Sequence, residues 1–396
     1  MNLTYKTIAE PTKAGAKWQQ LFHTAWPTYK SWLKASKFAS RISLGQRETA
    51  LKRYMPKLRD TYVHLCSLLD TDDNELAKNF LTGYYPPAYV GACTQAVIRT
   101  DKIQLVRNYD YHPRLLEGTL FLSMWNDKKV IATSDCLIGA VDGMNDSGLC
   151  VSLTFGGRKQ IGLGFGIPFI LRYVLEFCST TSEAVSVLKS IPSHMSYNVT
   201  IVDKKGNYKT VLLAPDKRPV VSSVTFATNH QKKVDWAENA AFNQTLKRSK
   251  FLKSFLKTKN LNAAELIKAF LHSPSYNSTY KEGFGTLYTA AYEPETLTVQ
   301  ILWPDKSIEK SFDSFAEEKI LIRYKQENLP IRNSGINEQP ETLDFNWQDA
   351  IVESLVSVFH KQTTETEKQK LKANLMPDKH IAWEAVIEYW NQPLQK

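Results

Sequence analysis

The spacing of apolar residues changes at Pro86-Pro87, and this change constrains the fold more than any other feature of the sequence. Before the pair, apolar residues such as Trp18 and Phe22 recur at helical spacing. From Cys93 onward they follow the shorter period of strands. A proline disfavours helical backbone in the residue before it, so the pair is predicted to end a helical region. Residues 1 to about 90 are therefore predicted to be helical, and a strand is predicted to begin near Cys93.

Beyond Cys93, strand and helix signals occur in groups. Turn signals at Asp101-Lys102 and at residues 204–207 predict two hairpins. Strands are predicted over 94–100, 103–107, 119–125, 130–134, 149–155, 197–202, 208–213, 222–228, 287–292 and 297–303, and helices over 167–178, 182–190, 236–257 and 262–271. Such grouping indicates sheets covered by helices, an α+β arrangement, and not a regular parallel βαβ series. Residues 325–345 are polar and linker-like, and residues 346–393 return to a helical pattern.

Cys93 lies in Gly91-Ala92-Cys93-Thr94-Gln95, at the predicted start of the first of these strands. If the peptide bond before it is cut, Cys93 carries a thiol nucleophile and an α-amine base on one residue. The pKa of an α-amine is about 8, so this amine can accept the thiol proton without a histidine. A lone cysteine is more often a small buried apolar residue, so the surrounding sequence has to support a catalytic role.

The composition argues against disulfides, metals and membrane spans. The five cysteines are odd in number and none are closely spaced, which does not suit a disulfide framework or a zinc ribbon. No two of the eight histidines stand at helical ligand spacing, so neither a metal nor another cofactor is expected. The N-terminal residues lack a signal-peptide core, and no apolar stretch reaches the length of a membrane span. These features predict a soluble, cytoplasmic protein.

The net charge of +10 raises the alternative of an anionic partner. The longest basic stretch, residues 247–259, surrounds an apolar helix face that contains Phe251 and Phe255. This pattern is typical of the solvated outer side of a helix that packs on a core. Aromatic residues do not interleave with the basic ones as a nucleic-acid platform requires, so no nucleic-acid partner is expected. A non-catalytic binding protein that uses a basic face remains the alternative to an enzyme.

Three further segments carry candidate site residues. Arg107-Asn108-Tyr109-Asp110 begins fourteen residues after Cys93, on the next predicted strand. Asn229 follows a strand in Ala227-Thr228-Asn229-His230, where a carboxamide can donate to an oxyanion. Arg248 lies on the helix predicted to follow. Taken singly, these segments also suit a strand end, a turn and a surface charge.

In this order, the segments resemble the acyl-coenzyme A:6-aminopenicillanic acid acyltransferase family, also called the isopenicillin-N acyltransferase family. This family belongs to the cysteine N-terminal-nucleophile hydrolases. The resemblance runs from about Tyr84 to Trp303. Its strongest segments are residues 91–95, 107–113, 142–149, 155–158 and 228–230. More distantly, the chain looks like the bile-salt hydrolases and penicillin V acylases.

The resemblance implies a four-layer αββα sandwich over residues 93–325. It implies a helical N-terminal segment, residues 1–92, in front of the nucleophile. The linker and helical C-terminal tail, residues 326–396, lie outside the resemblance. The family usually has Gly before the nucleophile, and this chain has Ala92.

The resemblance also implies a role for each site residue. Cys93 would be the nucleophile and its α-amine the base. Asp110 would bind this amine, and Arg107 would steady the thiolate. Asn229 would donate into the oxyanion hole, and Arg248 would support the site. A backbone N–H near Thr154 or Phe155 would be the second oxyanion donor.

These implications predict an enzyme that activates itself by cleavage between Ala92 and Cys93. Its expected substrate is a small molecule with an amide-linked or thioester-linked acyl group. Hydrolysis of the acyl group and its transfer to an acceptor amine both remain open, as does the oligomeric state. The two fragments are expected to stay associated because the helices of residues 1–92 carry apolar faces that need a partner surface.

Overall fold

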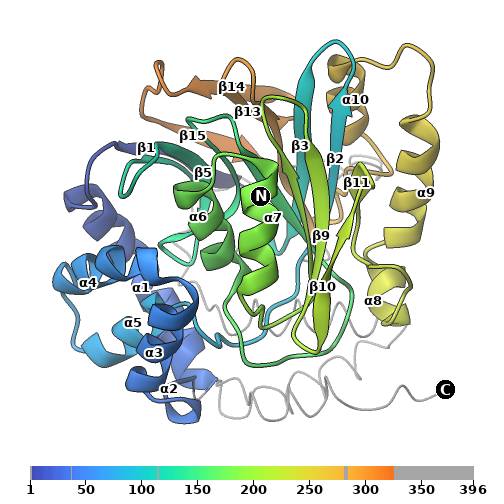
Figure 1. Ribbon diagram of the computed structural model, residues 1–396. Helices are drawn as coiled ribbons and strands as arrows, with labels where there is room; N and C mark the ends of the chain where they lie inside the picture. The colour runs from blue at the N-terminus through green and yellow to red at the C-terminus, as the bar shows by residue number, and fades with distance from the viewer. Residues whose placement is uncertain (1, 37, 114–115, 281–283, 325–396) are drawn as a thin grey trace, which may run out of the picture.

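The computed structural model describes residues 2–324, except 37, 114–115 and 281–283 (Figure 1). Two stacked β-sheets form its centre. Helices α6 (Ile167–Phe177) and α7 (Thr181–Ser190) cover the larger sheet, and α9 (Thr245–Phe255) and α10 (Ala263–Phe270) cover the smaller one. This arrangement confirms the α+β class and the αββα layers. Among the described residues, no helix is long and apolar enough to cross a membrane.

The larger sheet has nine strands, which lie in the order β10-β9-β8-β7-β6-β5-β4-β1-β15. In this order their bounds are β10 (Lys217–Ser222), β9 (Tyr208–Ala214), β8 (Tyr197–Val202), β7 (Cys150–Phe155), β6 (Gly139–Asn145), β5 (Val130–Asp135), β4 (Thr119–Ser123), β1 (Asn2–Glu10) and β15 (Glu318–Arg323). Neighbouring strands are antiparallel except β1 and β4, which are parallel. The hairpin predicted at residues 204–207 is confirmed as the connection between β8 and β9.

The smaller sheet has six strands in the order β11-β2-β3-β12-β13-β14. Their bounds are β11 (Phe226–Ala227), β2 (Ala92–Arg99), β3 (Ile103–Tyr111), β12 (Gly285–Glu293), β13 (Thr298–Trp303) and β14 (Lys306–Ser311). Side chains of both sheets form the apolar layer between them, and Cys93 belongs to this layer. The outer face of the smaller sheet packs against apolar residues of α9 and α10.

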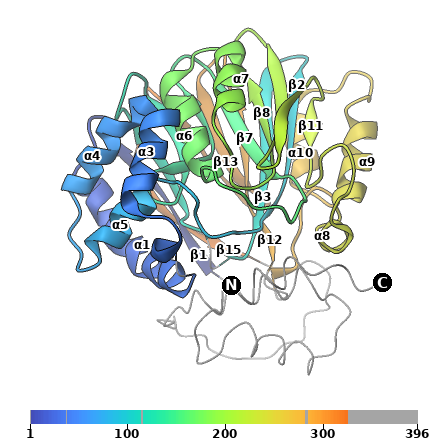
Figure 2. The same ribbon diagram turned by 60° about the horizontal axis from the view of Figure 1, so that its bottom comes forward.

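The N-terminal segment contributes helices α1 (Ala16–Ala35), α2 (Phe38–Arg41), α3 (Leu44–Tyr54), α4 (Arg59–Ser67) and α5 (Asn74–Leu81), with a 3-10 turn at Pro56–Leu58. They lie together at one side of the sandwich (Figure 2). The segment is not helical throughout, because β1 joins the larger sheet between β4 and β15. This strand was not predicted from the sequence, although Tyr5 and Thr7 are buried and alternate with more exposed residues in the period of a strand.

Several other elements differ from the sequence predictions. Strands β6, β10, β14 and β15 were not predicted, and the strand predicted over 222–228 is only the two-residue β11. The helix predicted over 236–257 is two helices, α8 (Ala237–Phe242) and α9. It breaks at Gln244, whose φ of +52° lies in the left-handed region that a continuing helix cannot use. The helix predicted over 346–393 lies outside the described residues.

Candidate active site

Cys93 is the second residue of β2, and the residue is 2 % exposed. The register of β2 and β3 pairs Cys93 with Tyr109, and Gln95 with Arg107. Alternate residues of a strand share a face, so Arg107 lies diagonally beside Cys93 on the face between the two sheets. Nη2 of Arg107 lies 3.1 Å from Sγ of Cys93. Burial raises the pKa of the Cys93 thiol, and the charge of Arg107 acts in the opposite direction.

The guanidinium of Arg107 is held from three other sides. Its Nη1 forms a buried ion pair with Asp142 of β6 and donates to the hydroxyl of Tyr288 at 3.2 Å. Its Nε donates to the carbonyl oxygen of Leu153 at 3.1 Å. These contacts fix the orientation of the Arg107 guanidinium that contacts Cys93.

Asp142 is in turn surrounded by donors. It accepts hydrogen bonds from the hydroxyls of Tyr288 at 2.6 Å, Tyr292 at 2.5 Å and Thr133 at 2.8 Å. Asp142 was not predicted as a site residue, although it begins the segment 142–149 on which part of the resemblance rests. Its aspartate-tyrosine network joins both sheets, and residues so far apart in the sequence carry no local signal of such a network.

Asp110 faces the opposite side of the smaller sheet. It lies across from Ala92 in the ladder of β2 and β3, so the carboxylate shares a face with the Ala92 side chain. Its Oδ1 accepts a hydrogen bond from Oγ1 of Thr286 at 2.7 Å, and its Oδ2 lies 3.6 Å from Nη1 of Arg248. Burial raises the pKa of Asp110 to about 6, although the charge of Arg248 and the hydrogen bond from Thr286 oppose this rise.

Asn229 follows β11 and contacts the backbone of Cys93. Its Oδ1 accepts from the backbone N–H of Cys93 at 3.0 Å and from Nη2 of Arg248 at 2.7 Å. Its Nδ2 donates to the carbonyl oxygen of Phe155 at 3.2 Å. The chain approaches Asn229 closely at Gly157, where the φ of +68° favours glycine and a Cβ would lie 2.3 Å from the Asn229 carbonyl oxygen.

Arg248 of α9 anchors the start of β2. Its Nη1 donates to the carbonyl oxygen of Cys93 and to Oγ1 of Thr94, both at 2.6 Å, and its Nε donates to the carbonyl oxygen of Asn243 at 2.9 Å. Arg248 is 2 % exposed, so it is not the surface charge that the sequence also allowed.

The structure thus brings all five predicted side chains together around one peptide bond, that between Ala92 and Cys93. The thiol and Arg107 lie on the inner face of the sheet, and Asp110 and Arg248 lie on the outer face. The two backbone positions are also close, since Phe155 contacts Asn229 through its carbonyl oxygen, and Oγ1 of Thr154 donates to the carbonyl of Thr228 at 2.9 Å. All five cysteines are free. Among the described residues, no three His, Cys, Asp or Glu side chains are grouped as metal ligands.

A sandwich of two sheets, with a cysteine at the start of an inner strand, is the architecture expected of the cysteine N-terminal-nucleophile hydrolases. Residues 98–307 match the family described as acyl-coenzyme A:6-aminopenicillanic acid acyl-transferase, and the chain belongs to this family. The matched region contains Arg107, Asp110, Asn229 and Arg248, and it begins five residues after Cys93.

Solved structures of low sequence identity also match. A mutant of the conjugated bile acid hydrolase from Clostridium perfringens is 13 % identical, with a TM-score of 0.40, over 61 % of this chain and 100 % of that chain. The penicillin V acylase from Agrobacterium tumefaciens is 14 % identical, with a TM-score of 0.36, over 58 % of this chain and 90 % of that chain. An N-acylethanolamine-hydrolyzing acid amidase orthologue from Caenorhabditis elegans is 17 % identical, with a TM-score of 0.40, over 59 % of this chain and 100 % of that chain. No curated protein sequence matches the chain.

Proposed function

We propose that the protein is a cysteine N-terminal-nucleophile enzyme that cuts itself before Cys93 and then acts on amide-linked or thioester-linked acyl groups of small molecules. Membership of the acyltransferase family supports the class of reaction. The observation that carries the proposal is the 3.1 Å contact between Nη2 of Arg107 and Sγ of Cys93. A fixed guanidinium at this distance favours the thiolate, which is the reactive form of cysteine.

The first reaction is cleavage of the chain. The Cys93 sulfur attacks the carbonyl carbon of Ala92, the C–N bond breaks, and the nitrogen takes up a proton to become the α-amine. The acyl part of the chain is then a thioester on Sγ. Water adds to the thioester carbonyl, which releases the free thiol and leaves a carboxylate on Ala92. The small side chain of Ala92 leaves room for this attack.

Cleavage supplies the base for later turnovers. The α-amine of Cys93 does not exist until the bond to Ala92 is broken, and its pKa is about 8 in ordinary surroundings. Asp110 lies across from Ala92 in the strand register. Once Ala92 has moved away, the new amine meets this carboxylate, which holds it close to the thiol.

In each turnover the amine accepts the thiol proton, and the sulfur attacks the acyl carbonyl of the substrate. The oxyanion accepts hydrogen bonds from Nδ2 of Asn229 and from a backbone N–H near Thr154 or Phe155. The amine then gives its proton to the leaving group, and the acyl group remains on Sγ as a thioester. Water or an acceptor amine takes the acyl group and restores the thiol.

Cleavage is tested on the purified full chain under denaturing conditions. We expect fragments of about 10 and 35 kDa from the mean residue mass of ordinary proteins. The larger one should begin Cys-Thr-Gln-Ala-Val, and Cys93→Ala should run as one band. An active wild-type enzyme that remains one intact chain would show that the α-amine is not the base.

The nucleophile is tested by labelling the folded protein with acyl-amide and acyl-thioester reagents, followed by mass mapping. The label should fall on Cys93 and not on Cys66, Cys136, Cys150 or Cys178. Equal labelling of the other four cysteines excludes Cys93 as the special nucleophile. Product analysis with and without an added acceptor amine separates acyl transfer from hydrolysis.

A further inference from the structure

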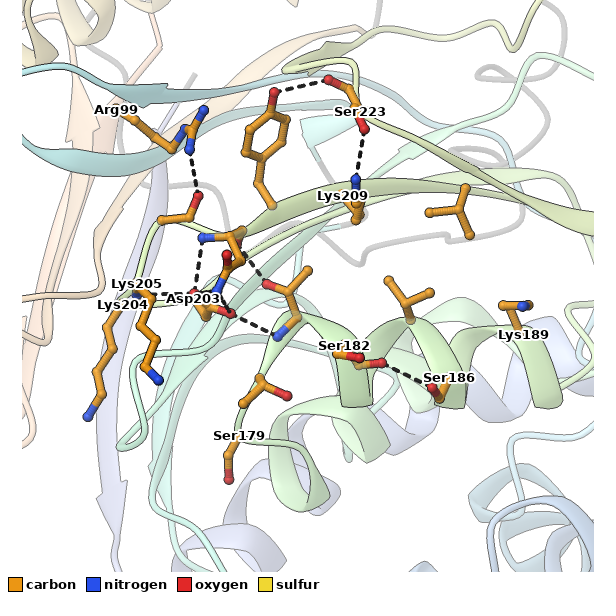
Figure 3. A pocket seen from close by; sticks show the side chains of 17 residues that line it. Arg99, Ser179, Ser182, Ser186, Lys189, Asp203, Lys204, Lys205, Lys209 and Ser223 are labelled. Atoms are coloured by element: carbon orange, nitrogen blue, oxygen red, sulfur yellow. Dashed lines mark hydrogen bonds between the residues drawn. The ribbon is translucent and has the colours of Figure 1, made fainter.

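A cavity of about 750 Å³ opens at the end of β2 that is remote from Cys93 (Figure 3). Its walls come from α7, from the turn between β8 and β9, and from the end of β10. Arg99, the last residue of β2, lines it. Arg99 lies six positions after Cys93 in β2, a distance of roughly 20 Å at the usual rise per residue. The cavity is therefore separate from the site around Cys93.

The lining of this cavity is strongly basic. It contains five basic residues and one acidic residue, Asp203; the basic ones are Arg99, Lys189, Lys204, Lys205 and Lys209. Asp203 is 4 % exposed. Its Oδ2 accepts from the backbone N–H of Thr181 at 3.1 Å, and its Oδ1 accepts from the backbone N–H of Asn207 at 3.1 Å. The Asp203 carboxylate is thus buried in the wall of the cavity and does not neutralise the positive charge of the basic side chains.

Two of the cations are held in place. Nη1 of Arg99 donates to the carbonyl oxygen of Gly206 at 3.1 Å, and its guanidinium lies over the ring of Tyr208, 4.7 Å from the centroid. Nζ of Lys209 donates to Oγ of Ser223 at 2.8 Å. Both side chains lie across the cavity from the helix α7 (Figure 3). Neither is bound to an acid in the described part of the chain, so both keep their charge available.

The remaining cations are exposed. Lys189, Lys204 and Lys205 line the cavity and form no ion pair with a described residue. Two N–H groups in the first turn of α7 already have acceptors: Oγ1 of Thr180 accepts from the N–H of Glu183, and Asp203 accepts from the N–H of Thr181. Recognition of an anion here would therefore depend on the basic side chains.

We propose that this cavity binds a phosphorylated small molecule of the size of a nucleotide. Its volume lies within the range of about 300–1,000 Å³ that is usual for small-molecule sites. Lysine and arginine side chains are the usual partners of phosphate oxygens. Val185, Val221 and the ring of Tyr208 supply apolar surface for the rest of the ligand. A hollow of this kind suits a compact ligand better than a polymer, which needs an extended basic track.

The test uses the full-length Cys93→Ala chain, so that binding is measured without any catalytic reaction. Calorimetry with ADP and with inorganic pyrophosphate compares this protein with the same protein carrying Lys204→Glu and Lys205→Glu. The matched control carries Lys253→Glu and Lys257→Glu, two exposed lysines of the region of α9 that do not line the cavity. Both pairs change the net charge equally, and thermal unfolding confirms that each variant is folded.

We expect ADP and pyrophosphate to bind. The affinity for each should be at least about tenfold lower in the cavity variant, because exposed charge contacts are lost and repulsion is added. The control should stay within about twofold. Absence of binding at millimolar concentration overturns the proposal. Equal weakening in the control does so too, because it means that only the net charge matters. Binding of RNA without binding of ADP, lost in the cavity variant, would assign the surface to a polymer instead.

Discussion

Arg107 and Cys93 lie diagonally opposite on adjacent strands, and Nη2 of Arg107 is 3.1 Å from Sγ of Cys93. The contact lies between two sheets, where burial alone raises the pKa of the thiol. In the proposed mechanism, the thiolate of Cys93 therefore depends on the charge and the fixed orientation of one guanidinium. Asp142 supplies that orientation from the other sheet.

Replacement of Arg107 by lysine tests this dependence. Lysine keeps the charge but cannot contact Sγ, Asp142 and the Leu153 carbonyl at once. We expect the pH at which Cys93 reacts half-maximally with a thiol reagent to rise, measured as alkylation rate against pH. The control is Arg172→Lys, which changes another buried, ion-paired arginine on α6. An unchanged alkylation profile in Arg107→Lys would mean that the guanidinium does not stabilise the thiolate.

Replacement of Asp142 by asparagine tests the support behind Arg107. It removes the buried partner charge and leaves the guanidinium uncompensated, so we expect the free energy of unfolding to fall by about 3–5 kcal/mol. Urea denaturation of the full chain at neutral pH measures it. A loss under about 1 kcal/mol would show that the neighbouring tyrosines and the Leu153 carbonyl hold Arg107 without the carboxylate.

Asn229→Ala tests the oxyanion role. Loss of one oxyanion donor lowers kcat by about a hundredfold to a thousandfold. The variant should also be less stable by about 1–3 kcal/mol, because the Cys93 N–H and Arg248 lose a buried acceptor. The control is Asn145→Ala, since Asn145 is equally buried and its Nδ2 donates to two carbonyl oxygens between β6 and α6. Similar losses of kcat in the two folded variants would assign Asn229 a structural role only.

The raised pKa of Asp110, about 6, predicts a pH dependence of self-cleavage. If the carboxylate form assists cleavage, the ratio of the wild-type rate to the Asp110→Asn rate should rise with pH, reach half its maximum near pH 6 and then level off. The titration of the Cys93 thiol is common to both proteins, so it does not affect this ratio. The measurement is the fraction of full-length chain against time at each pH. A ratio that does not change between pH 5 and 7 would contradict the assignment.

The raised pKa of Asp110 also makes the free energy of unfolding depend on pH. The folded chain holds the Asp110 proton more tightly than the unfolded chain, whose aspartates have a pKa of about 4. As the pH rises from 4 to 6, the free energy of unfolding of uncleaved Cys93→Ala should therefore fall relative to that of Cys93→Ala with Asp110→Asn, by on the order of 2 kcal/mol. Above pH 6 the difference between the two should be constant. Urea denaturation at several pH values measures it, and a constant difference from pH 4 to 6 would show that the pKa is not raised.

The proximity of the candidate site residues could be predicted from the sequence better than the order of the strands in the sheets. Cys93, Arg107 and Asp110 lie on two strands joined by a short turn, so their spacing in the sequence nearly determines their spacing in the fold. Strand β1 was missed because the long helices around Trp18 dominate the first ninety residues. Asp142 was missed as a site residue because its partners, Arg107 and Tyr288, come from the opposite sheet. Such a contact depends on how the sheets stack, which no local pattern records.

The place of β1 predicts that the two fragments stay together after cleavage, for a reason beyond the apolar helices. Strand β1 lies inside the larger sheet, with hydrogen-bonded ladders to β4 on one side and β15 on the other. Release of residues 1–92 would break both ladders and expose Tyr5, which is 1 % exposed. We expect the fragments to elute as one species in size-exclusion chromatography under native conditions and to separate only in denaturant.

Tyr5→Asp, which places a charge in the layer between the sheets, should promote separation after cleavage, whereas Thr4→Asp at an exposed position of the same strand should not. Fragments that separate without denaturant would show that β1 leaves the sheet once the chain is cut.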